Sequence, residues 1–341
     1  MKGKVLVTGG LGYIGSHTTV ELINAGYEVV IVDNLSNSNI EVLNGIHKIT
    51  NVTPEFVLVD CCDYEQLYLN VFSVHKFDCI IHFAAYKAVG ESVNEPLKYY
   101  YNNLLSFMNI LKLSIDTECY NILFSSSATV YGEADELPVT ENTKRKLATS
   151  PYGNTKQICE DILRDVCNAN SIHGISLRYF NPIGAHPSGY IGENPKGKPN
   201  NLVPFITQTA VGKYDRLEVF GDDYDTPDGS TLRDYIDVVD LASAHVSAMD
   251  RMLQNKMHTN YEVFNIGTGK PVSVFELIRE FEKANNIKLN YKVANRREGD
   301  VPIIYADTTL ANNELNWKAE RPLSETLKCA YQWEMVNQHT E

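Results

Sequence analysis

The sequence lacks the features expected of a membrane, secreted or nucleic-acid-binding protein. No run in its 341 residues approaches the roughly 20 consecutive apolar residues that a membrane-spanning helix needs. The chain passes at once into the short apolar run 5–7, which is too brief for a signal peptide. Basic residues are scarce: 30 Lys and Arg stand against 43 Asp and Glu, giving a net charge of −13. Such a surface repels phosphate backbones, so we expect neither a membrane nor a nucleic-acid partner.

Cysteines are also few, and they show no metal-binding pattern. The seven cysteines form no CxxC pair, their number is odd, and several lie inside apolar runs. This usage predicts reduced, mostly buried thiols, a cytoplasmic location and no bound metal. The remaining composition, 43% hydrophobic and 21% charged, is that of an ordinary globular protein.

The first half of the chain alternates short apolar runs with helical patterns. This alternation is the signature of an α/β fold, a Rossmann-type doubly wound parallel sheet with helices on both faces. The strands are predicted at Lys4–Thr8, Glu28–Asp33, Glu55–Asp60, Cys79–Phe83, Asn121–Ser125 and Ile175–Arg178.

The pattern changes after residue 180. Residues 186–201 contain three Gly and three Pro and predict an irregular loop, followed by helices at Leu202–Val211 and Asp237–Leu253. We therefore expect a Rossmann domain over 1–180 and a smaller mixed α/β domain over 181–341. The apolar segment 262–267 could rejoin the first sheet.

A glycine motif follows the first predicted strand. Gly9, Gly12 and Gly15 allow a tight turn and the close approach of a pyrophosphate, and the next helix directs its positive N-terminal end at that position. The second strand ends at Asp33, eighteen residues after Gly15. A carboxylate there can bind both adenosine ribose hydroxyls and would repel a 2′-phosphate, which predicts NAD rather than NADP. Asp60, at the end of the third strand, is either a partner for the adenine amino group or a solvated turn residue.

A second motif places a phenol and an ammonium on one helix. Ser150 and Pro151 suit the start of a helix, and Tyr152 and Lys156, four residues apart, share one face. A phenol with its usual pKa of about 10 is a poor base, but a nearby ammonium favours the phenolate and lowers that pKa. Ser127 closes the fifth strand, where it could hydrogen-bond to the reacting oxygen. The serine at a strand end and the Tyr-Lys pair are each common alone. Only their combination with the glycine motif indicates a catalytic site.

The glycine turn, the serine strand end and the Tyr-Lys pair together resemble the extended short-chain dehydrogenase/reductases. Longer strings resemble the UDP-glucose (UDP-galactose) 4-epimerases, in family order over essentially the whole chain. They are TGGLGYIGSH (8–17), HFAAYKAVGES (82–92), SSSATVYG (125–132), SPYGNTK (150–156), RYFNPIGAHPSG (178–189), PNNLVPF (199–205), RDYIDV (233–238) and RREGDVP (296–302).

The resemblance implies catalysis by Tyr152 as base, Ser127 as its hydrogen-bonding helper, and Lys156 as the residue that tunes Tyr152 and holds the nicotinamide ribose. The implied NAD contacts are Gly9, Gly12, Tyr13, Ile14, Gly15, Asp33, Asn34, Asn37, Ser38, Asp60, Cys61, Phe83, Ala84, Lys87, Asn102, Ser127, Tyr152, Lys156 and Tyr179. The implied UDP-sugar contacts are Lys87, Ser127, Tyr152, Asn181, Asn201, Leu202, Phe220, Arg233, Tyr235, Arg297, Asp300 and Ile304.

The implied reaction is oxidation and re-reduction at C4 of a UDP-hexose, with rotation of a 4-keto sugar that stays tethered by UDP. Arg233 and Arg297 would bind the diphosphate, since guanidinium offers forked donors. Ile304 falls beside the C2 substituent, where tyrosine occurs in members restricted to plain hexoses and a small residue in members that accept N-acetyl sugars. Isoleucine matches neither pattern; we expect room for an acetamido group, the alternative being an ordinary core side chain. Family members usually dimerise through two helices, here 97–115 and 151–169.

The same fold also serves two other functions. A nucleotide-sugar 4,6-dehydratase would have Asp-Glu directly after the active Ser or Thr, where this chain has Ala128 and Thr129. A non-catalytic NAD-sensing protein would typically lose the tyrosine or the lysine, and both are present.

Overall fold

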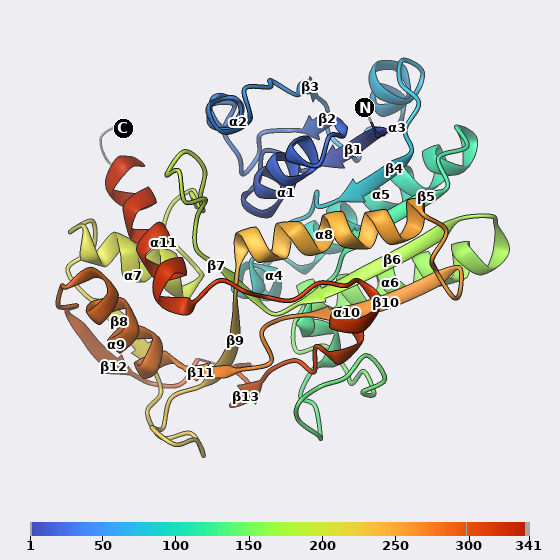
Figure 1. Cartoon of the computed structure of the whole chain (residues 1–341). Helices are drawn as coiled ribbons and strands as arrows, with labels where there is room; N and C mark the ends of the chain where they lie inside the picture. Colours follow the sequence, from blue (N-terminus) through green and yellow to red (C-terminus); the bar gives the residue numbers. More distant parts are fainter. Residues whose placement is uncertain (1, 298, 338–341) are drawn as a thin grey trace.

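The structure, a computed structural model, describes residues 2–297 and 299–337, so Met1, Glu298 and 338–341 of the ranges discussed above lie outside it. Its centre is a seven-stranded parallel sheet (Figure 1). The strand order is β10 (Tyr261–Ile266), β6 (His173–Tyr179), β5 (Asn121–Ser125), β4 (Cys79–His82), β1 (Lys4–Thr8), β2 (Glu28–Asp33) and β3 (Glu55–Leu58).

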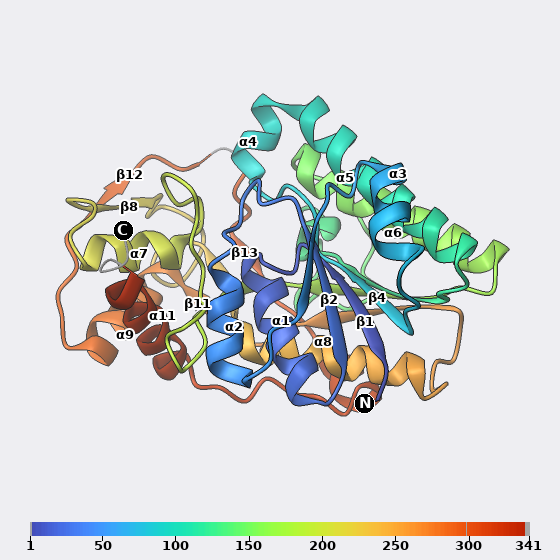
Figure 2. The ribbon, with the colours of Figure 1, turned by 90° about the horizontal axis from the view of Figure 1, so that it is seen from above.

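Helices cover both faces of this sheet, as the alternating pattern predicts (Figure 2). Val5 and Val7 of β1 face one apolar core and Leu6 faces the other, because successive side chains of a strand point to opposite faces. The first core is closed by α1 (Tyr13–Asn24), α2 (Val42–Thr50) and α8 (Val238–Leu253). The second is closed by α3 (Tyr64–Leu67), the π-helical turn Tyr68–Phe72, α5 (Pro96–Asp116) and α6 (Pro151–Ala169).

A smaller body is built mainly from the second half of the chain. Its four-stranded mixed sheet has β9 (Leu232–Asp237) at the centre, paired with β7 (Asn181–Ile183), β11 (Pro271–Ser273) and β13 (Ile303–Ile304). A parallel pair, β8 (Leu217–Phe220) and β12 (Tyr291–Ala294), lies beside it. A third core joins these strands to α7 (Leu202–Ala210), α9 (Val274–Asn285) and α11 (Leu323–Asn337). Short helices α4 (Val89–Asn94), Ala128–Tyr131 and α10 (Thr309–Glu314) complete the fold.

Several element boundaries differ from the sequence expectation. β3 ends at Leu58 and β4 at His82, one or two residues early, while β6 begins at His173 and ends at Tyr179. The segment 261–266 forms β10, which pairs in parallel with β6 and extends the first sheet. Since α8 packs against the same sheet, two elements from the second half of the chain belong in space to the first body.

None of the helices among the described residues combines the length and apolar character needed to cross a membrane. Within residues 2–297 and 299–337, no group of three His, Cys, Asp or Glu side chains could hold a metal ion. All seven cysteines are free thiols.

Candidate active site

A large cleft of about 1200 Å³ lies at the carboxyl ends of the parallel strands. The chain runs from β1 to β3 in one direction and from β4 to β6 in the other, so the strand order reverses beside β1. Ligands of open α/β sheets bind at such a reversal. The cleft is walled by the β1–α1 turn, the ends of β2 and β5, and the start of α6. From the second half it is walled by residues 179–182, 189–190, 192–198, 201, 297, 299–301 and 304.

The glycine turn at one end of the cleft leaves no space for side chains. Gly9 has φ +68°, and a Cβ on it would lie 2.8 Å from the Ala84 nitrogen. A Cβ on Gly15 would lie 2.3 Å from the Gly9 oxygen. Gly12 stands at the N-cap of α1, which no side chain caps, so the positive end of the helix opens toward the cleft. This cradle fits a dinucleotide pyrophosphate.

Asp33 lies where β2 ends and is nearly buried in the wall of the cleft. Its Oδ1 accepts hydrogen bonds from the Leu35 nitrogen at 2.9 Å and the Ser38 hydroxyl at 2.7 Å. Its Oδ2 accepts one from the Leu11 nitrogen at 3.1 Å. These donors fix the carboxylate between the glycine turn and the next loop, the position expected for a ribose ligand. Asp60 accepts from Asn34 Nδ2 at 3.0 Å on the same wall.

The reactive groups meet in the middle of the cleft. The Ser150 hydroxyl accepts from the Gly153 nitrogen at 3.1 Å and caps α6, as expected. Lys156 Nζ donates to the Ser125 carbonyl at 2.6 Å and lies 5.8 Å from the centre of the Tyr152 ring. Ser127 hydrogen-bonds to Tyr152. Strand β5 and helix α6 thus bring together the three residues that the motifs indicated.

The electrostatics of this group differ from the sequence expectation. Burial raises the pKa of Tyr152 to about 12, although the hydrogen bond with Ser127 opposes this. Burial lowers the pKa of Lys156 to about 8, while Cys159 and Glu160 act in the opposite direction. The expected lowering of the phenol pKa by Lys156 is therefore absent, because desolvation penalises both charged forms.

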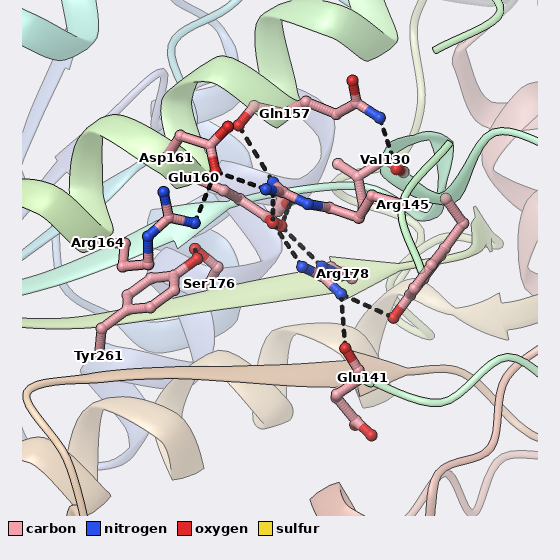
Figure 3. Close-up of polar contacts among 12 residues, drawn as sticks. Val130, Glu141, Arg145, Gln157, Glu160, Asp161, Arg164, Ser176, Arg178 and Tyr261 are labelled. Carbon is pink, nitrogen blue, oxygen red and sulfur yellow. Dashed lines mark hydrogen bonds and ion pairs between the residues drawn. The ribbon is translucent and has the colours of Figure 1, made fainter. Parts of the chain in front are cut away.

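The sequence motifs did not reveal the ion pair between Arg178 and Glu160, which Figure 3 shows. Arg178 of β6 donates to both oxygens of Glu160 at 2.9 and 2.6 Å, and both side chains are almost fully buried. The Ser126 hydroxyl donates to the same carboxylate at 2.5 Å. Because Ser126 precedes Ser127, the pair fixes the strand end that carries Ser127. The signal that could have found it was spacing, since Glu160 stands four residues after Lys156 on α6.

The other end of the cleft has the chemistry of an anion site. Arg233 lies on β9, and Arg297 and Asp300 follow β12. Asp300 Oδ1 lies 3.2 Å from Arg297 Nη2 and 3.9 Å from Arg233 Nη2, so one carboxylate joins the two guanidinium groups. Burial lowers the pKa of Arg233, and Asp300 opposes this. Two arginines facing one cleft suit a diphosphate.

Every residue expected to bind NAD lines the cleft, whereas only some of the residues expected to bind the UDP-sugar do. The residues Lys87, Ser127, Tyr152, Asn181, Asn201, Arg233, Arg297, Asp300 and Ile304 line it. Three others do not. Leu202 packs against the third core, Tyr235 is buried beside Arg233, and the ring of Phe220 lies 6.0 Å from the Arg297 guanidinium.

Known proteins resemble the whole chain. Residues 6–329 match the family model described as GDP-mannose 4,6 dehydratase. The chain is 48% identical over 340 residues to a UDP-glucose 4-epimerase of Drosophila melanogaster, covering 98% of this chain and 97% of that protein. It resembles the crystal structure of UDP-glucose 4-epimerase from Bifidobacterium longum in complex with NAD+ and UDP, with TM-score 0.94 and 45% identity over 99% and 100% of the two chains. The UDP-Glc/GlcNAc 4-epimerase of Campylobacter jejuni gives TM-score 0.83 and 35% identity over 98% and 99%.

Proposed function

Because this chain belongs to the UDP-glucose 4-epimerase family of the extended short-chain dehydrogenase/reductases, we propose that its cleft holds NAD against the hexose of a UDP-sugar and inverts C4. The single observation that carries the proposal is the position of Tyr152, Ser127 and Lys156 midway along one cleft. The glycine cradle and Asp33 lie at one end, and the two arginines lie at the other. The N-terminal half is accordingly the NAD-binding part and residues 181–341 the UDP-sugar-binding part.

The side chains divide the chemistry between them. When bound, NAD would supply the hydride acceptor and the hydride donor for C4, and Gly9, Gly12, Gly15 and Asp33 would hold it. Tyr152 takes the proton of the C4 hydroxyl as the hydride leaves C4, and it returns that proton when the hydride comes back to the opposite face. Ser127 donates to the phenolate, and Lys156, held by the Ser125 carbonyl, orients the nicotinamide ribose. Arg233 and Arg297 keep UDP bound while the sugar turns.

The residues that follow β5 do not provide the side chains that a dehydratase reaction needs. The family model that matches the chain takes its description from a dehydratase, so the fold alone does not choose between the two reactions. Elimination of water needs an additional acid and base. Ala128 and Thr129, which directly follow Ser127, contribute neither a carboxyl group nor another titratable side chain.

Replacement of the base tests the proposed function. Tyr152→Phe keeps the ring in place but removes the only proton acceptor assigned to the C4 hydroxyl. We expect turnover of UDP-galactose to fall by roughly 10²–10⁴-fold, the range for loss of general-base help. Tyr64→Phe is the matched control, since that hydroxyl binds Asp116 at an exposed position outside the cleft wall. Turnover of Tyr152→Phe within a few-fold of the parent would remove Tyr152 from the mechanism.

We further propose a homodimer in the cytoplasm. α5 exposes the large apolar side chains Leu97, Tyr101 and Met108, of which Leu97 is 82% exposed, and the neighbouring helix α4 exposes Val93. This apolar surface on α4 and α5, with α6 alongside, suits contact with a second copy. Free thiols suit the reducing cytoplasm.

A charge on α5 tests the dimer. We expect Leu97→Glu to convert a dimer into a monomer in analytical ultracentrifugation. Leu147→Glu, a matched change at a side chain that is 92% exposed elsewhere, should leave the dimer intact. A monomeric parent, or an unchanged mass for Leu97→Glu, would overturn the proposed interface.

The side chain at position 304 bears on which UDP-hexoses the enzyme accepts. Ile304 lies in the cleft wall, and because isoleucine lacks the distal half of a tyrosine ring it would leave space beside C2 of the sugar. We propose that the enzyme converts both plain UDP-hexoses and their N-acetyl counterparts. The similarity to the Campylobacter jejuni UDP-Glc/GlcNAc 4-epimerase supports this.

A further inference from the structure

A segment of the second half of the chain lies across the cofactor end of the cleft. Residues 189–196, here called the strap, leave β7 and reach α2 of the first body before the chain turns back to α7 (Figure 2). Gly189, Tyr190 and 192–196 line the cleft opposite Asp33 and residues 36–38. The end of the cleft assigned to adenosine is therefore bounded by both bodies.

The middle of the strap is anchored in the first body. Ile191 is 1% exposed and belongs to the apolar core that also contains Ile46 of α2. A Cβ on Gly45 would lie 2.4 Å from the Tyr190 carbonyl oxygen, so only glycine lets the strap approach α2 this closely. Lys48 Nζ lies 5.1 Å above the Tyr190 ring. The burial of Ile191 and the close approach of Gly45 to Tyr190 make the middle of the strap a fixed point.

Glu193 joins the strap to both sides of the cleft. Its Oε1 accepts hydrogen bonds from Lys87 Nζ at 2.9 Å and from Asn201 Nδ2 at 2.7 Å, and the side chain is 9% exposed. The Glu193 carbonyl accepts from Trp333 Nε1 at 3.2 Å. Lys87 is an expected contact of the cofactor and of the sugar nucleotide, and Asn201 is an expected contact of the sugar nucleotide. The Glu193 carboxylate therefore positions side chains that would bind both molecules.

The C-terminal end of the strap is held to the first body by one exposed lysine. Lys196 Nζ donates to the Leu35 carbonyl at 2.9 Å and to the Ser36 carbonyl at 3.0 Å. Leu35 has φ +58°, a backbone conformation that a branched side chain rarely adopts. The Leu35 nitrogen donates to Asp33. Lys196 therefore binds the same loop that positions the Asp33 carboxylate, the expected ligand of the adenosine ribose.

We propose that Lys196 is a latch that retains NAD by fastening the strap to the loop after Asp33. The inference rests on the proposed function, since an epimerase must keep its cofactor between the two halves of each turnover. Ile191 and Glu193 hold the rest of the strap in buried contacts, whereas the Lys196 hydrogen bonds lie at the surface. They are the contacts that can open and close most easily when the nucleotide enters or leaves.

The test measures cofactor loss from holoenzyme. Lys196→Met keeps the apolar stem and removes the ammonium. Holoenzyme is dialysed, and the nucleotide left on the protein is quantified by absorbance after denaturation. We expect NAD to leave on the order of 10-fold faster than from the parent, because two hydrogen bonds to an ammonium are lost at an exposed position. Lys196→Arg, which restores the donors, should recover most of the retention.

The matched control is a lysine outside the cleft wall. Lys288→Met makes the same change at an exposed lysine whose ammonium pairs with Glu282 at 2.8 Å, and it should release NAD at the parent rate. Equal release from parent and Lys196→Met, or equally fast release from both methionine variants, would overturn the latch. Failure of the proposed function looks different: the parent itself would then carry no nucleotide and leave UDP-galactose unchanged.

Discussion

Replacing Ile304 by tyrosine should separate the two substrate classes. Ile304 pairs with Arg233 on β9 and is 9% exposed. One side of it packs against a small apolar cluster that includes Val130 and Phe180, which are 0% and 6% exposed. The cluster has no space for an additional ring. The tyrosine side chain would therefore extend into the cleft, toward the space proposed for the acetamido group.

The size of the effect follows from overfilling a packed site. Forcing additional atoms into such a site costs roughly 1–3 kcal/mol. At about 1.4 kcal/mol per tenfold, Ile304→Tyr should depress kcat/KM for UDP-N-acetylglucosamine by roughly 5- to 150-fold. Activity on UDP-galactose should change little, since a plain hexose has only a hydroxyl at C2.

The assay compares both substrates on parent and variant by separating the UDP-sugars chromatographically. Ile303→Tyr is the matched control, because Ile303 is the neighbouring strand residue and does not line the cleft. It should leave the ratio of the two activities unchanged. The reasoning is refuted if the parent does not convert the N-acetyl sugar, or if Ile304→Tyr loses both activities equally.

Three further predictions concern cofactor choice, acid stability and the buried ion pair. Protein stripped of nucleotide should regain activity with NAD and not with NADP, because Asp33 would repel a 2′-phosphate; equal rescue by NADP refutes its role. Burial lowers the pKa of His17, His82 and His245 to about 3, 3 and 4. Below the ordinary value of about 6.5 the unfolded chain binds protons that the folded chain does not. Stability should therefore fall by on the order of 1 kcal/mol per histidine from pH 7 to pH 5.5, and equal urea midpoints at both pH values would contradict this. Glu160→Gln should cost about 3–5 kcal/mol of unfolding free energy by leaving a buried cation without its partner, and an unchanged denaturation midpoint would count against it.

Local features of the sequence predicted the parts of the site that depend on short-range chemistry. The glycine turn, the end of β2 at Asp33 and the Ser150 cap of α6 all follow from neighbouring residues, and the structure has each in its expected place. Tyr152 and Lys156 share a helix face for the same reason, because their spacing alone decides it.

Features that depend on long-range packing could not be predicted in this way. Residues 186–201 were expected to be irregular because of their Gly and Pro content, but nothing local indicated that Ile191 would enter the core beside α2. The pKa of Tyr152 was expected to fall, and it rises because the depth of burial depends on the whole fold. Likewise, the Arg178–Glu160 pair joins residues whose partnership depends on how α6 packs on β6.

The central claim is that this chain inverts C4 of a UDP-hexose with cofactor it already carries. The most direct test incubates the purified protein with UDP-galactose and no added NAD, and follows the products by chromatography. We expect UDP-glucose to accumulate until the ratio of UDP-glucose to UDP-galactose is constant, and a reaction that starts from UDP-glucose should reach the same ratio. Unchanged UDP-galactose, or formation of a 4-keto-6-deoxy sugar nucleotide in its place, would contradict it.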